Sequence, residues 1–95
     1  MASSVDELTV NWEEDGVLKV KELKKHVLSK GAWSTIMFLY QEMDGKTKEY
    51  KPAKIAIRRY RKRNNEYMLQ SKFNISSKAQ GEDIASMITE WYKDL

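Results

Sequence analysis

Three stretches of the chain have the residue pattern of β-strands, and in a fourth the apolar residues recur at helical spacing. Residues 33–42 (WSTIMFLYQE) are rich in β-branched and aromatic types and predict a strand that is apolar on both sides. Residues 53–63 and 66–75 predict two more strands, joined by a tight turn at Asn64–Asn65, a pair that tolerates positive φ. From residue 77 onward the apolar spacing becomes three and four, which predicts a helix.

The stretch from residue 17 to residue 31 fits two patterns. Helical spacing is shown by its apolar residues Val20, Leu23, Val27 and Leu28, and Gly31 resembles a helix stop. The opening VLKVK suits a strand equally well. The sequence therefore leaves this element open between strand and helix.

The C-terminal helix has both a start signal and an apolar stripe. Ser77 and Gln80 match a capping box, in which Ser77 accepts from the Gln80 N–H and Gln80 reaches back. The stripe that we expect to pack on the sheet consists of Ile84, Met87, Ile88 and Trp91. The predicted fold class is α+β: an antiparallel twisted sheet of about four strands followed by a C-terminal helix.

Alternation assigns the two faces of the predicted hairpin. We expect Ile55 and Ile57 to point into the core, and Tyr67, Leu69, Phe73 and Ile75 can share that side. The opposite side is expected to carry a polar and aromatic set: Lys54, Arg58, Tyr60, Lys62, Gln70, Lys72 and Asn74. Three further cations, Arg59, Arg61 and Arg63, continue the apolar side outward and are secondary candidates.

Charge divides the chain into an acidic start, a basic middle and an acidic end. Residues 1–16 hold five acids and no base, which predicts a flexible acidic arm ahead of a single domain at 17–95. Residues 17–80 hold sixteen bases and five acids, which suggests a polyanionic partner. One hypothesis is that the acidic arm folds onto the basic sheet and competes with that partner.

Catalytic and metal-binding patterns are sparse. The chain has no cysteine and a single histidine, His26, so thiolate zinc sites and His-rich metal sites are excluded. No Gly-rich phosphate loop occurs, and no apolar run is long enough to span a membrane. We expect a non-enzymatic protein without metal or cofactor, with no membrane association.

A strand surface that interleaves cations with an aromatic ring is typical of single-strand nucleic-acid binding. Cations track the phosphates, and bases stack on the aromatic ring. The polar and aromatic set around Tyr60 supplies both. Two alternatives stay open: a small basic ribonuclease of the toxin type, and an RNA-binding or protein-interaction module.

Three short motifs in order resemble one known family. Ile57-Arg58-Arg59-Tyr60 is similar to the Ile-Arg-x-Tyr strand of the transcriptional coactivator family called positive cofactor four. The run from Lys72 to Ser77 resembles its Lys-Gly-Ile-Ser-Leu strand end, and Gln80 stands where that family has an early helix Gln. The resemblance covers roughly Ala53 to the end. Gly81 stands where the family usually has Trp.

The resemblance implies a dimer held through the C-terminal helices and single-stranded DNA binding with little sequence preference. Lys72 inherits the role of the family's basic residue before Ile-Ser. Such a protein acts in transcription, replication or recombination. Its expected location is the cytoplasm of a bacterial or phage-infected cell, or the nucleus of a eukaryote. RNA remains an alternative ligand.

Overall fold

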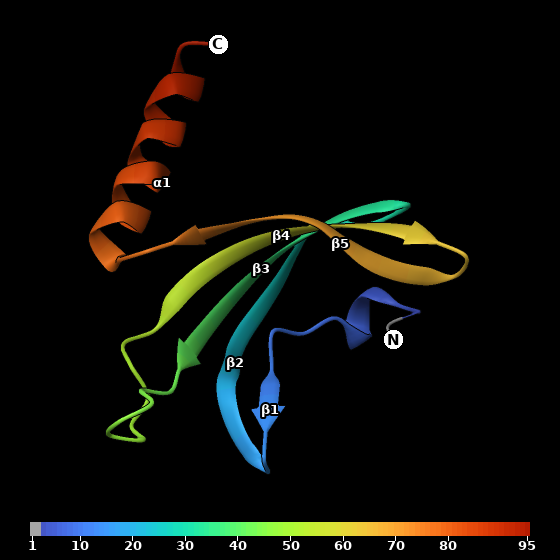
Figure 1. Ribbon diagram of the computed structural model, residues 1–95. Helices are drawn as coiled ribbons and strands as arrows, with labels where there is room; N and C mark the ends of the chain where they lie inside the picture. Colours follow the sequence, from blue (N-terminus) through green and yellow to red (C-terminus); the bar gives the residue numbers. More distant parts are fainter. Residues whose placement is uncertain (1–2) are drawn as a thin grey trace.

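The computed structural model describes residues 3–95 as one curled antiparallel sheet with a helix at its end (Figure 1). The elements in chain order are a 3-10 turn η1 (Val5–Glu7), β1 (Trp12–Glu14), β2 (Val17–Ser29), β3 (Trp33–Glu42), β4 (Lys54–Arg63), β5 (Glu66–Ile75) and α1 (Lys78–Lys93). Strand order follows chain order, β1-β2-β3-β4-β5. The α+β class is confirmed, with five strands rather than about four.

The ambiguous region is a strand, β2. It pairs with β3 along most of its length, and the register shifts between Glu22 and Lys24 and again between Val27 and Ser29. Leu23 and Leu28 are the residues at these two irregularities, and both side chains are exposed. Because each bulge moves the apolar positions by one, a strand here imitates helical spacing.

The hairpin between β4 and β5 forms as predicted. Asn64 and Asn65 have φ of 50° and 63°, the left-handed conformations that a tight two-residue turn requires. Arg63 and Glu66 flank the turn as cross-strand partners. A register shift between Arg59 and Tyr60 then places Leu69 opposite Tyr60, and Tyr67 opposite Lys62. The prediction that Tyr67 and Leu69 share a side with Ile55 and Ile57 is therefore wrong.

The sheet buries the face opposite to the one predicted. Its buried side, here called the inner face, carries Ile36, Phe38, Ala56 and Tyr60, all of them at most 5% exposed. Since cross-strand partners share a side, the other side, the outer face, carries Met37 with Ile57 and Leu39 with Ile55. These outer residues are only half-buried. The prediction that Ile55 and Ile57 point into the main core is therefore wrong.

The inner face is covered by the N-terminal segment, residues 5–10, which lies within the curve of the sheet (Figure 1). Val5, Leu8 and Val10 are buried in the same cluster as Phe38. The Lys25 Nζ donates to the backbone carbonyls of Val5 at 2.7 Å and Leu8 at 2.6 Å, which fixes the segment's path.

The acidic start of the chain is therefore integrated into the domain in the part that the structure describes, rather than forming a flexible arm. It does lie on the sheet, but apolar side chains make the contact. Its carboxylates stay at the surface, since Asp6, Glu7, Glu13, Glu14 and Asp15 are all exposed. The correction has a simple cause: burial of three apolar side chains outweighs a charge pattern that can remain solvated.

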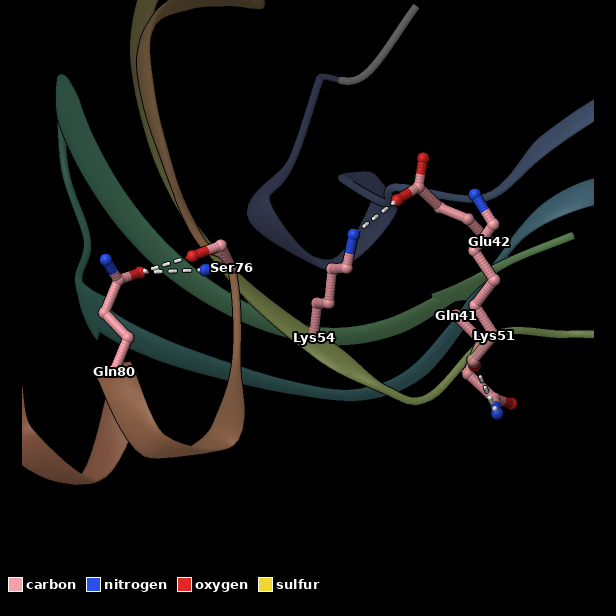
Figure 2. A network of polar contacts seen from close by, with 6 residues as sticks. All are labelled: Gln41, Glu42, Lys51, Lys54, Ser76 and Gln80. Atoms are coloured by element: carbon pink, nitrogen blue, oxygen red, sulfur yellow. Dashed lines mark hydrogen bonds and ion pairs between the residues drawn. The ribbon is translucent and has the colours of Figure 1, made fainter. Parts of the chain in front are cut away.

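The C-terminal helix begins as predicted but does not pack on the sheet. Ser77 Oγ accepts from the Gln80 N–H at 3.1 Å, whereas the Gln80 side chain reaches back to Ser76, not to Ser77 (Figure 2). The helix leads away from the end of β5 (Figure 1) and has no buried residue. Ile88 is exposed, and Trp91 is 71% exposed, so the expected packing of the stripe on the sheet of its own chain is wrong.

Candidate nucleic-acid interface

Four of the predicted binding residues do share one side of the sheet. Arg58 is the cross-strand partner of Lys72, and Asn74 lies opposite Ala56. Lys54 lies opposite Tyr40 on the same inner face. These four positions lie beside the buried cluster, toward the start of β4 and the end of β5. Their grouping was predicted correctly, although the side they occupy is the one that the N-terminal segment covers in part.

Tyr60 does not lie on an open surface. Its side chain is 5% exposed and packs in the core cluster with Phe38 and Ile36. Burial raises the pKa of the phenol, an effect that the neighbouring Arg58 partly offsets. The prediction that this ring offers an outward stacking surface is wrong, because the segment at 5–10 completes a core over it.

The remaining two residues of the predicted set lie apart from the four. The Lys62 Nζ is 5.4 Å from the centre of the Tyr67 ring, near the hairpin turn. Gln70 is the unpaired residue at the β5 register shift, and its Nε2 donates to the Met68 carbonyl at 3.4 Å. By alternation along β4 Lys62 lies on the same inner side as Arg58, four residues further toward the hairpin, whereas the bulge takes Gln70 out of the cross-strand pairing.

The outer face has an exposed aromatic ring flanked by two arginines. The Trp33 side chain is 40% exposed at the start of β3. The guanidinium carbons of Arg59 and Arg61 lie 4.3 Å and 5.2 Å from the centre of its ring, within cation–π range. Arg61 is the direct cross-strand partner of Trp33, and Arg59 lies on its diagonal. We call these three residues the Trp33 patch.

The turn before β3 holds Trp33 in place. The Lys62 N–H donates to the Ala32 carbonyl at 2.7 Å, which extends the β3–β4 pairing to the residue before Trp33. The Tyr67 hydroxyl donates to the Gly31 carbonyl at 3.0 Å, and the buried Ser34 hydroxyl donates to that same carbonyl at 3.1 Å. The backbone beneath the patch is therefore fixed from three strands.

Charge on the outer face favours an anion. The cross-strand pairs on this side of the described sheet, from Ile55–Ile75 to Arg61–Met68, contain no carboxylate. Lys24 and His26 of β2 lie on the same side, opposite Leu39 and Met37. The third secondary candidate, Arg63, differs from Arg59 and Arg61 because its cross-strand partner is Glu66.

The outer face is divided along β4 into an apolar half and a cationic half. Ile55 and Ile57 lie at the end near α1, whereas Arg59 and Arg61 lie at the hairpin end. At a rise of about 3.3 Å per residue, Ile55 and Arg61 are roughly 20 Å apart. An anion on the Trp33 patch and a protein contact on the apolar half therefore need not exclude each other.

Metal-binding clusters and membrane-spanning helices are not found in the part of the chain that the structure describes. No group of three or more histidines and carboxylates among residues 3–95 is arranged to hold a metal ion. Within the same residues, no helix is long and apolar enough to cross a membrane. His26 is exposed on a strand surface and has only Met37 as cross-strand partner.

Comparison with known proteins gives no relative. No protein-family model, no curated protein and no solved structure matches the chain. The resemblance to the positive cofactor four family therefore stays a prediction, and the interface is argued from its own geometry.

Sequence reasoning did not identify Trp33 as a candidate binding residue. The ring was counted as one apolar position of a two-sided strand, because it alternates with Met37 and Leu39 against Ile36 and Phe38. The signal that could have found it is the register: once β3 pairs with β4, Trp33 falls opposite Arg61. Alternation within one β-strand cannot predict that pairing, because the pairing depends on the length of the β3–β4 connection.

Proposed function

We propose that this protein binds single-stranded DNA with little sequence specificity through the Trp33 patch of the outer face. The observation that carries the proposal is the exposed Trp33 ring with the Arg59 and Arg61 guanidinium groups within 5.2 Å of its centre. An unpaired base can stack on the indole or on a guanidinium plane, and the cations meet the phosphates on either side. Duplex DNA offers the phosphates but keeps its bases stacked inside.

The expected binding free energies suit a weak contact that tolerates any base sequence. Base stacking on an aromatic ring is worth roughly 1–3 kcal/mol per base. Each phosphate that a cation neutralises adds a contribution that falls with salt. Because every base has a π-face and every nucleotide a phosphate, such a surface distinguishes single strands from duplex without reading sequence.

The inner-face residues Lys54, Arg58, Lys72 and Asn74 remain part of the proposal as a second group. Lys72 and Asn74 are exposed, and Arg58 is half-buried. The role that we propose in the cell is in transcription, replication or recombination, where single strands form. Such a role fits the cytoplasm of a bacterial or phage-infected cell, or a eukaryotic nucleus.

Titration of labelled oligothymidylate and of a matching duplex, at several salt concentrations, tests this function. We expect tighter binding to the single strand, with the logarithm of affinity falling linearly with the logarithm of salt concentration. Equal affinity for the single strand and the duplex would show that base stacking does not contribute to binding. Cleavage of RNA by the purified protein would instead favour the toxin-type ribonuclease.

We further propose that the protein is a homodimer in which α1 of one protomer covers the other. A groove of about 430 Å³ lies between the first turns of α1 and the outer face, lined by Leu39, Ile55, Ile75 and Ala85 among others. Lys54 and Lys78 also line this groove. The far half of α1 combines exposed Ile88 and Trp91 with Glu90, and Asp94 is the C-cap residue that follows the helix.

A second copy of the chain is the occupant that we propose for this groove, because its lining is largely apolar and its two lysines, Lys54 and Lys78, outnumber its one carboxylate, Glu82. A two-fold arrangement lets each helix place its apolar far half in the groove of its partner, with carboxylates near the lysines. The alternative is a helix with no buried side chain, although packing of an apolar stripe supplies most helical stability in proteins. The Trp33 patch lies at the other end of the sheet and stays open in such a dimer.

A further inference from the structure

A polar pocket of about 380 Å³ opens on the inner face, beside the part that the N-terminal segment covers. This volume falls within the usual range of small-ligand sites, roughly 300–1,000 Å³. One wall is the run from Thr9 to Trp12, and the rest comes from β2, β3, β4 and β5. The pocket is separate from the Trp33 patch, which lies on the outer face of the sheet.

Cationic and amide donors converge in this pocket from two neighbouring strands. Arg58 and Lys72 are cross-strand partners, and Asn74 is the next residue of β5 on the same side. The Arg58 Nε is buried and has no hydrogen-bond partner among the residues that the structure describes. Because the Nε itself is closed off and the Arg58 side chain also interacts with the Tyr60 hydroxyl, a ligand in the pocket would have to meet the terminal nitrogens of the guanidinium.

The local charge favours an anionic acceptor. Glu42 also lines the pocket, but its Oε1 lies 3.5 Å from the Lys54 Nζ (Figure 2). Glu22 adds a second carboxylate beside the Thr9 wall, so the three cations Lys54, Arg58 and Lys72 exceed the two carboxylates by one charge. A phosphate monoester offers several oxygens to two cations and an amide at once.

The wall of the pocket is held rigidly and ends in an exposed aromatic ring. The Thr9 hydroxyl donates to the Glu22 carboxylate at 2.6 Å, and the Asn11 Oδ1 accepts from the Glu22 N–H at 2.7 Å. Both side chains are thereby committed to fixing the segment against β2. Trp12 follows them, lines the pocket and is 59% exposed, so its ring is free to stack on a base.

We propose that this pocket binds the phosphate monoester of a nucleotide, with the phosphate on Arg58 and Lys72 and the base against Trp12. The same chemistry is offered by a free nucleotide and by the phosphorylated end of a DNA strand. Where the ligand is a strand end, the proposal rests on the function proposed above and adds recognition of that end.

The test uses the full chain and three kinds of probe. Thymidine 5′-monophosphate and thymidine are titrated separately while NMR follows the Trp12 indole and the Lys72 amide. Oligothymidylates with a 5′-phosphate and with a 5′-hydroxyl are compared by fluorescence anisotropy. We expect saturable shifts with the monophosphate and none with thymidine, and roughly tenfold tighter binding of the phosphorylated strand, as one charge-assisted contact implies.

Variants separate the pocket from the patch. Lys72→Gln is expected to abolish the preference for the phosphorylated strand, whereas Lys46→Gln, at an exposed position in the β3–β4 connection, keeps it. Trp12→Ala should reduce binding of the monophosphate to that of inorganic phosphate. Monophosphate shifts without any strand binding would support the pocket for a free nucleotide and contradict the proposed function. Equal binding of both strands, with no saturable monophosphate shift, would overturn the pocket and leave the proposed function standing.

Discussion

The guanidinium carbon of Arg59 lies 4.3 Å from the centre of the Trp33 ring. The two residues come from different strands and meet only because β3 and β4 pair in one register, with Trp33 opposite Arg61. This contact combines a π-surface and a positive charge in one exposed place. In the proposed interface Trp33 takes the stacking role that the sequence motif suggested for Tyr60. The Tyr60 ring is buried on the inner face.

Replacing Trp33 by alanine should weaken binding of oligothymidylate by roughly 1–3 kcal/mol, because a stacking surface is lost while the cations remain. Fluorescence anisotropy at constant salt measures the effect. Tyr92→Ala is a matched control, since Tyr92 is an aromatic residue that is also exposed but lies on α1. Equal losses in the two variants would show that Trp33 has no special role.

Replacing Arg59 by glutamine should change how binding depends on salt. Loss of one phosphate contact is expected to reduce the slope of log affinity against log salt by about one unit. Arg61→Gln should behave in the same way. Arg63→Gln should have a smaller effect, because Arg63 lies opposite Glu66. An unchanged slope in the Arg59 and Arg61 variants would place the phosphates elsewhere.

Tyr60 should matter for stability rather than for direct contact with DNA. Tyr60→Ala removes a buried ring and should cost about 3–5 kcal/mol in the free energy of unfolding, as for other large core aromatics. Tyr60→Phe keeps the ring and should retain DNA affinity. Chemical denaturation and anisotropy measure the two quantities. A stable Tyr60→Ala variant that fails to bind would restore the original interpretation of the motif.

The buried phenol also predicts a pH dependence of stability. Burial raises the Tyr60 pKa above its ordinary value of 10.0, so the unfolded chain loses this proton first as the pH rises. The contribution of Tyr60 to stability is complete below pH 10.0 and falls as the pH rises from there through the folded-state pKa. Denaturation at several alkaline pH values should show a smaller decline for Tyr60→Phe than for the natural protein.

The exposed stripe of α1 should control self-association. Trp91→Glu places a charge in the apolar far half of the helix and is expected to convert a dimer to a monomer, because the charge would lose its hydration in the partner's groove. Thr89→Glu, an exposed position beside the stripe, should leave the dimer intact. Analytical ultracentrifugation distinguishes the two states. A natural protein that is monomeric at high concentration would contradict the dimer.

The limits of sequence reasoning can be seen in particular residues. The strands at 33–42 and 66–75 and the turn at Asn64–Asn65 were predicted correctly, because alternation and turn chemistry are local properties. The inner and outer faces were exchanged, because both sides of β3 are apolar and local alternation cannot tell which side becomes covered. That choice depends on residues 5–10, where the spacing of Val5, Leu8 and Val10 fits neither a strand nor a helix.

Bulges account for most of the remaining errors. Leu23 and Leu28 stand at register shifts that made a strand resemble a helix. The irregularity after Arg59 moved Leu69 to the side of Tyr60. A one-residue slip reverses every later side chain, so face assignments hold only between bulges. The grouping of Arg58, Lys72 and Asn74 was predicted correctly because no bulge separates them.

The most direct test of the account is an NMR titration of the isotope-labelled protein with oligothymidylate, following backbone amides and the indole N–H groups. We predict that the shifts concentrate on Trp33, Arg59 and Arg61 on the outer face and spare the exposed connection at 45–49. Shifts confined to the inner face, or no shift of the Trp33 indole at saturating oligothymidylate, would contradict the Trp33 patch as the single-strand interface.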